Sequence, residues 1–150
     1  MIKKIFLAAM LVSFSFGVPD DKVERLYHSE ITNLNEIAKA QHRGAVLIDV
    51  RRPEEWSSTG VIEGSKKIMS FDADGKLDMI RFEKELKQHN ISKDDEILLI
   101  CRSGNRSVFT ANELVKLGYT NVKNVTFGIK SWVAENRHTS SGFDILENVK

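Results

Sequence analysis

Two continuous apolar segments constrain the fold of this chain more than any other feature of its sequence. Residues 45–50 read AVLIDV and residues 96–101 read EILLIC, and neither segment alternates between apolar and polar side chains. Strands of this kind are covered on both faces, as in parallel sheets flanked by helices. The two segments therefore predict two buried strands, and weaker strand candidates lie at residues 67–69 and 122–126.

Segments with apolar residues at helical spacing lie between and around these strands. They occur near residues 34–43, 80–90, 108–118 and 129–133. Gly118 is placed to end the third of them, since glycine readily takes the backbone conformation that closes a helix. Strands that alternate with helices predict an α/β domain with a mainly parallel sheet.

Composition narrows the functional class. The chain has 150 residues, of which 41% are hydrophobic and 29% are charged, as in a soluble globular protein of one domain. The formal net charge is +1, so no strong field would attract nucleic acid or an anionic membrane. A single cysteine excludes an internal disulfide and a cysteine-based structural zinc site.

Residues 1–17 resemble a secretory signal peptide. Lys3 and Lys4 form a basic start, residues 5–16 are an apolar run, and Gly17 supplies a small residue for cleavage. A retained interfacial anchor is the alternative interpretation. Cleavage would leave residues 18–150 as one domain in a bacterial periplasm, without stable membrane contact and with a net charge of 20 − 21 = −1.

The segment with the clearest chemistry is ICRSGNRS at residues 100–107. It follows a buried strand and opens a helix, the place where ligands bind in open α/β sheets. Gly104 allows a tight turn whose backbone N–H groups converge, and the helix start adds further free N–H groups. Arg102 and Arg106 add permanent positive charges. The turn therefore favours an anion beside Cys101.

We expect this turn to stabilise Cys101 as a thiolate. Lowering the pKa of a free cysteine, near 8.5, by about two units takes roughly 2.7 kcal/mol. One helix terminus contributes only about 0.3–1 kcal/mol, so several N–H donors and both arginines would have to act together. A Cys–His pair and an inert core cysteine are the alternatives. The histidines, none of them near Cys101 in sequence, are His28, His42, His89 and His138.

Charged residues also follow the first buried strand. Asp49 ends that strand and could hold Arg51 by a bidentate pair, or both could contact the pocket directly. Both interpretations of this pair remain open from the sequence. Pro53 suits a first helical position, and Glu54 and Glu55 suit the first turn of the same helix.

Together these segments resemble the rhodanese family of sulfurtransferases in its single-domain form, over about residues 30–136. Four motifs match in order: DVRRPEEW at 49–56, G-x-I-x-G at 60–64, CRSGNRS at 101–107, and Gly128 with Trp132. The resemblance implies a five-stranded, mainly parallel sheet with helices on both faces. It also implies that Cys101 is the nucleophile and that Asp49 and Arg51 support the site. The residues that would bind the substrate are Arg102, Ser103, Gly104, Asn105 and Arg106.

The resemblance implies thiosulfate sulfurtransferase activity without a metal or organic cofactor. A small anionic donor such as thiosulfate would leave a persulfide on Cys101, and cyanide in assays or a thiol in the cell would remove its sulfur. The amides of residues 102–106 would hold the persulfide, while Arg102 and Arg106 would attract the donor. One alternative is a persulfide carrier that serves an acceptor protein. The other is a phosphatase or arsenate reductase, although these have a loop one residue longer.

Three positions depart from the family pattern. Val61 stands where histidine is frequent, and Glu63 stands where proline is frequent. Phe127 replaces the usual first glycine before Gly128, which makes it a candidate for lining or narrowing the pocket.

Overall fold

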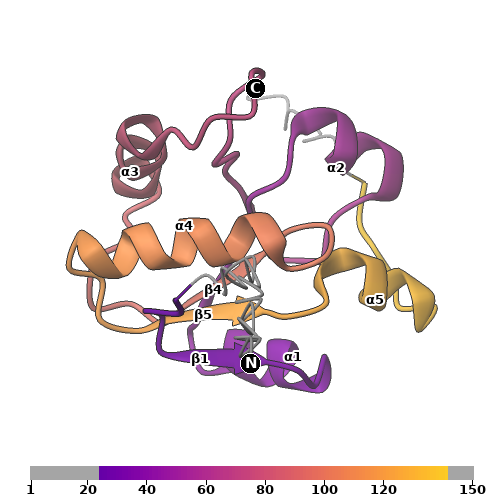
Figure 1. Cartoon of the computed structure of the whole chain (residues 1–150). Helices are drawn as coiled ribbons and strands as arrows, with labels where there is room; N and C mark the ends of the chain where they lie inside the picture. Colours follow the sequence, from indigo (N-terminus) through magenta and orange to yellow (C-terminus); the bar gives the residue numbers. More distant parts are fainter. Residues whose placement is uncertain (1–23, 142–150) are drawn as a thin grey trace, which may run out of the picture.

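The computed structural model describes residues 24–141, and the predicted signal segment lies outside them (Figure 1). Its strands are β1 (Ser29–Ile31), β2 (Val46–Asp49), β3 (Lys66–Lys67), β4 (Ile97–Ile100) and β5 (Val122–Val125). Its helices are α1 (Asn35–His42), α2 (Pro53–Thr59), α3 (Met79–Gln88), α4 (Asn105–Lys116) and α5 (Gly128–Ala134). Strands and helices alternate along the chain, as the sequence predicted.

The strands form one parallel sheet in the order β1-β5-β4-β2-β3. The two continuous apolar segments became β2 and β4, which lie side by side in its centre with Asp49 opposite Ile100. The predicted parallel α/β fold is therefore confirmed. The sequence did not predict β1, because its three residues carry no apolar pattern and only Ile31 is buried.

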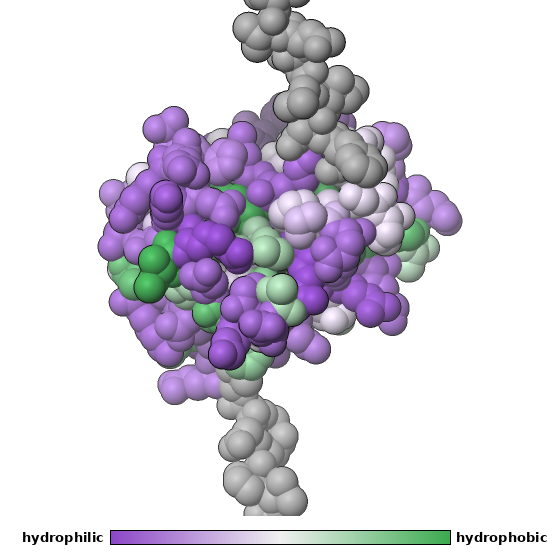
Figure 2. Space-filling view, turned by 90° about the horizontal axis from the view of Figure 1, so that it is seen from above, coloured by the Kyte–Doolittle hydropathy of each residue, from purple (hydrophilic) through white to green (hydrophobic). Residues whose placement is uncertain are grey.

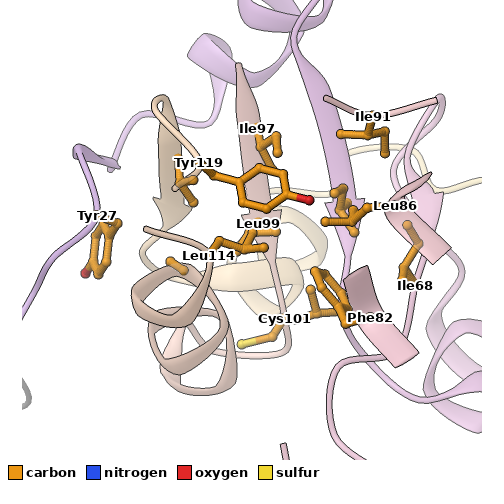
Figure 3. Close-up of a cluster of buried hydrophobic side chains, with 14 residues drawn as sticks. Tyr27, Ile68, Phe82, Leu86, Ile91, Ile97, Leu99, Cys101, Leu114 and Tyr119 are labelled. Carbon is orange, nitrogen blue, oxygen red and sulfur yellow. The ribbon is translucent and has the colours of Figure 1, made fainter. Parts of the chain in front are cut away.

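Helices cover both faces of the sheet. On one face, α3 and α4 pack on the sheet through Phe82, Leu86 and Leu114, and Figure 3 shows this cluster. On the other face, α1 and α5 pack through Ile37 and Ile129. Because both faces are covered, the side chains of β4 are all fully buried, which explains its unbroken apolar sequence.

The chain returns towards α2 after α5. Val61 and Ser140 exchange backbone hydrogen bonds of 3.0 and 2.8 Å, and the indole N–H of Trp132 donates to the carbonyl of His138 at 2.8 Å. The surface seen from above is mostly hydrophilic, with hydrophobic side chains in small separate patches (Figure 2). Within residues 24–141, no helix has the length and apolar content needed to cross a membrane.

Candidate active site at the Cys101 loop

Cys101 follows β4 directly, at the carboxyl edge of the sheet. Its side chain is 1% exposed and lies beside Phe82 at the border of the apolar cluster, with the sulfur directed away from the aromatic ring (Figure 3). The Sγ atom accepts a hydrogen bond from the backbone N–H of Gly104 at 3.1 Å. The Ser107 hydroxyl lies 3.4 Å from Sγ and 3.0 Å from the Gly104 carbonyl, so its one hydrogen can donate to either. The sulfur therefore lies inside a turn that presents donors to it.

Gly104 makes this turn possible. Its φ of +93° lies in the left-handed region, and it is the N-cap residue of α4. A Cβ atom at this position would collide with the carbonyl oxygen of Thr126, which follows β5. Only glycine allows the turn to close against β5 while its N–H donates to the sulfur.

The start of α5 supports the same turn from the other side. The N–H groups of Ile129 and Lys130 donate to the carbonyls of Cys101 and Arg102, at 2.8 and 3.0 Å. Gly128 has a φ of +61°, and a Cβ there would collide with both of these carbonyl groups. The glycine that precedes Trp132 in the sequence motif therefore gives the loop room to contact α5.

Arg106 is held by Glu55 of α2. Its two terminal nitrogens donate to the two oxygens of the Glu55 carboxylate at 2.7 and 2.6 Å. The bond to Glu55 raises the pKa of Arg106. Burial raises the pKa of Glu55, but the hydrogen bonds from Arg106 and from the Arg52 N–H outweigh it and bring that pKa below its usual value.

This contact changes the role expected for two residues. Arg106 was predicted to attract the anionic donor, but its charge is balanced by Glu55, and the pair clamps the start of α4 to α2. Glu55 was predicted only to suit the first turn of its helix. It does accept the N–H of Arg52 there at 3.0 Å, and it also holds the loop.

Asp49 and Arg51 form the structural pair that was one of the two predicted alternatives. Arg51 Nε and Nη2 donate to the Asp49 carboxylate at 2.7–3.1 Å, and the two side chains are 0–1% exposed. Arg51 also donates to the hydroxyl of Thr59 and to the carbonyls of Glu55 and Gly60. All three guanidinium nitrogens are therefore occupied, and this pair ties the end of β2 to both ends of α2.

The remaining loop residues face solvent. Arg102, Ser103 and Asn105 are exposed, and the Arg102 guanidinium has no hydrogen bond or ion pair with any residue from 24 to 141. The four histidines, all within that range, make no hydrogen bond to Cys101, which favours the donor-lined turn over a Cys–His pair. No group of three or more His, Cys, Asp or Glu side chains in the described part of the chain is placed to hold a metal ion.

Sequence reasoning missed the contributions of Glu55 and Ser107. Ser107 follows the loop arginine and could have been noticed as a hydroxyl in the first turn of the helix, six residues after Cys101, whereas nothing in the sequence paired Glu55 with Arg106. Phe127 is 55% exposed and does not line the pocket beside the loop, which corrects the suggestion that it narrows this pocket.

The chain is similar to known proteins. The family model for the rhodanese-like domain matches residues 33–135. An adenylyltransferase and sulfurtransferase of Lodderomyces elongisporus is 31% identical over 81% of this chain, which spans 27% of that relative's length. Thiosulfate sulfurtransferase 16 of Arabidopsis thaliana, a chloroplastic protein, is 29% identical over 74% of this chain and 90% of its own length.

The fold is found in solved structures as well. A rhodanese-related protein of Thermoplasma volcanium superposes with a TM-score of 0.53 at 28% identity, covering 74% of this chain and 96% of that one. The relatives from Lodderomyces elongisporus and Arabidopsis thaliana both carry the word sulfurtransferase in their names. This chain belongs to the rhodanese-like domain family.

Proposed function

We propose that the chain is a thiosulfate sulfurtransferase that works through a persulfide on Cys101. The Cys101 thiolate attacks the outer sulfur of thiosulfate, and the sulfur–sulfur bond breaks with its electron pair leaving on sulfite. The persulfide then gives its outer sulfur to a nucleophile and regenerates the thiolate. Cyanide becomes thiocyanate in this second step, and a thiolate becomes a persulfide.

The observation that carries this proposal is the environment of the Cys101 sulfur. The Gly104 N–H and the Ser107 hydroxyl lie at 3.1 and 3.4 Å from it, and α4, which begins at Asn105, leaves its first backbone N–H groups without partners inside the helix. Such donors stabilise an anion without transferring their own proton to it, as both a thiolate and a terminal persulfide require. The name of the Arabidopsis thaliana relative, a thiosulfate sulfurtransferase, supports the choice of donor.

Intact-mass measurement after incubation with thiosulfate tests the proposal. We expect a gain of one sulfur atom on the peptide that contains Cys101, and its loss when cyanide is added. The Cys101→Ser variant is the control and should gain no mass. A chain that never gains sulfur from thiosulfate would contradict the proposal.

Steady-state kinetics separate this enzyme from a persulfide carrier. Double displacement predicts parallel lines in double-reciprocal plots when thiosulfate and cyanide are varied together. A persulfide that forms but that neither cyanide nor small thiols discharge would identify a carrier that needs an acceptor protein.

We further propose export to a bacterial periplasm, on the basis of residues 1–17. The basic start and apolar run of this segment are the supporting observations. Mass measurement of the protein from the periplasmic fraction should give a chain that starts near Val18. An uncleaved chain in the cytoplasm would contradict this assignment.

A further inference from the structure

The backbone carbonyl of Thr126 packs directly against the Cys101 turn. Its oxygen takes the space that a Cβ atom at position 104 would need, so it lies close to the backbone of Gly104. The N–H of the same glycine donates to the Cys101 sulfur at 3.1 Å. The position of this donor therefore depends on where the Thr126 carbonyl lies.

Thr126 is itself held by β1. In the sheet, β5 lies between β1 and β4, and Thr126 directly follows β5 (Figure 1). Its N–H donates to the carbonyl of Ile31 at 3.1 Å, and its hydroxyl donates to the Glu30 carboxylate at 2.6 Å. Because these two bonds start from different atoms of Thr126, together they fix the orientation of the residue and of its carbonyl.

Several polar groups converge on the Glu30 carboxylate. Its Oε2 also accepts the side-chain amide of Asn124 at 2.9 Å, and its Oε1 accepts the Tyr27 hydroxyl. Arg25 forms an ion pair with it at 3.0 Å. Burial raises the pKa of Glu30, but the hydrogen bonds outweigh this effect and bring that pKa below its usual value. Glu30 is therefore a carboxylate at neutral pH and is held in place by its neighbours.

We propose that Glu30 is a positioning residue for the reactive sulfur: it holds Thr126, whose carbonyl keeps the Gly104 N–H directed at Cys101. This inference rests on the proposed function, because it assigns Glu30 to the cysteine that carries the reaction. Glu30 forms no hydrogen bond with residues 101–107, all of which the structure describes, so its effect passes through Thr126.

The pH profile of alkylation by iodoacetamide tests this role, since Cys101 is the only thiol in the chain. Thr126→Val removes the hydroxyl and keeps the shape of the side chain. It should move the midpoint of the profile upward by about half a pH unit, because the Gly104 donor is less firmly held when this hydrogen bond is lost. Thr126→Ser keeps a hydroxyl and should retain the wild-type midpoint.

Glu30→Ala should move the midpoint in the same upward direction. Loss of a negative charge would by itself lower the midpoint, because the thiolate would meet less repulsion. An upward shift therefore reports the lost hydrogen bond to Thr126 and not the lost charge. When Glu30→Ala is added to Thr126→Val, it should cause no further upward shift, since both substitutions remove the same bond.

The matched control is Glu96→Ala. The Glu96 carboxylate also binds a residue of β5, since it pairs with Lys123 at 2.6 Å, and its side chain is 15% exposed against 21% for Glu30. Glu96 directly precedes β4, whereas Cys101 directly follows it, so the two lie at opposite edges of the sheet. Glu96→Ala should lower the free energy of unfolding and leave the midpoint unchanged.

The inference is overturned if Glu30→Ala leaves the midpoint unchanged or lowers it, or if Glu96→Ala raises it equally. Should Glu30→Ala fail to fold, the two variants of Thr126 decide, because Glu30 is the acceptor of the Thr126 hydroxyl. Equal midpoints for Thr126→Val and Thr126→Ser would then overturn the inference.

Sulfur loading separates this inference from the proposed function, since alkylation requires no sulfur transfer. A wild-type chain that never gains sulfur from thiosulfate, with the expected midpoint shifts in the variants, would refute only the proposed function. A wild-type chain that gains sulfur, with no midpoint shift in Thr126→Val and Glu30→Ala, would refute only the role of Glu30.

Discussion

The turns after β2 and β4 lie at the same edge of the sheet but use their polar groups in opposite ways. After β2, Asp49 and Arg51 are buried, and each nitrogen of the guanidinium has a partner within the chain. After β4, Arg102 is exposed without a partner from residues 24–141, and the Cys101 sulfur receives donors from its own turn. In the first turn the charges of Asp49 and Arg51 neutralise each other. In the second turn the charge of Arg102 is available to a ligand.

This difference indicates that the β2 turn stabilises the fold, whereas the β4 turn carries the reactive group. Substitutions in the β2 turn should lower the free energy of unfolding, because they leave a buried charge without its partner. Substitution of Cys101 in the β4 turn should act mainly on reactivity. The following predictions test this contrast, beginning with the largest expected effect.

Cys101→Ser should abolish sulfur transfer, with a loss of about 10³-fold or more, because no other thiol exists in the chain. Its free energy of unfolding in urea should change by less than about 1.5 kcal/mol, since serine has a similar size. Transfer is measured as thiocyanate formation. Substantial activity in this variant would show that Cys101 is not the nucleophile.

Asp49→Ala should destabilise the fold by about 3–5 kcal/mol, because it leaves the buried Arg51 guanidinium without its counter-ion. Urea unfolding followed by circular dichroism measures this loss. The exposed Asp74→Ala is the matched control and should change stability by less than about 0.5 kcal/mol. Equal stability of the two variants would contradict a structural role for the pair.

Gly104→Ala should cost about 1–2 kcal/mol from its left-handed conformation, with a further cost from the collision with the Thr126 carbonyl. The loop should shift and withdraw the Gly104 N–H from the sulfur, so that iodoacetamide alkylates Cys101 more slowly at neutral pH. Gly75→Ala is the control, since Gly75 also has a positive φ of +77° but no atom would crowd its Cβ. Equal effects of the two substitutions on alkylation would refute the role of the turn.

Acid should release the clamp between Glu55 and Arg106. The folded-state pKa of Glu55 lies below its ordinary value, so the carboxylate contributes stability that is present above the ordinary pKa and is lost as the pH falls through the folded-state pKa. Unfolding curves from pH 6 to 3 should therefore show a steeper loss for the wild type than for Glu55→Gln, by about 1 kcal/mol in total for this partly buried pair. Parallel losses in the two chains would show that the clamp adds no stability.

The sequence predicted the local elements of the site well. Unbroken apolar runs at β2 and β4, a proline at the start of α2 and a glycine before α4 each follow from short-range sterics and burial. The cysteine turn could be located because its strand, its glycine and its helix are contiguous. Even so, the sequence could not show which arginine of the turn, Arg102 or Arg106, has no ion-pair partner among residues 24–141.

Contacts between residues that are distant in the chain could not be predicted from the sequence. Arg106 and Glu55 are 51 residues apart, and Lys130 approaches Arg102 only because α5 follows β5 beside the loop. From the sequence, either Arg102 or Arg106 could have formed an ion pair with a carboxylate. Both were therefore predicted to have the same role, attraction of the anionic donor.

The sequence alone thus determined a parallel α/β domain and a cysteine turn at the end of a central strand, since these depend on neighbouring residues. Only the tertiary structure decided which charges cancel and which remain available to a ligand. The physical reason is that ion pairs and pockets depend on distances across the fold, and those distances are set by how the layers pack.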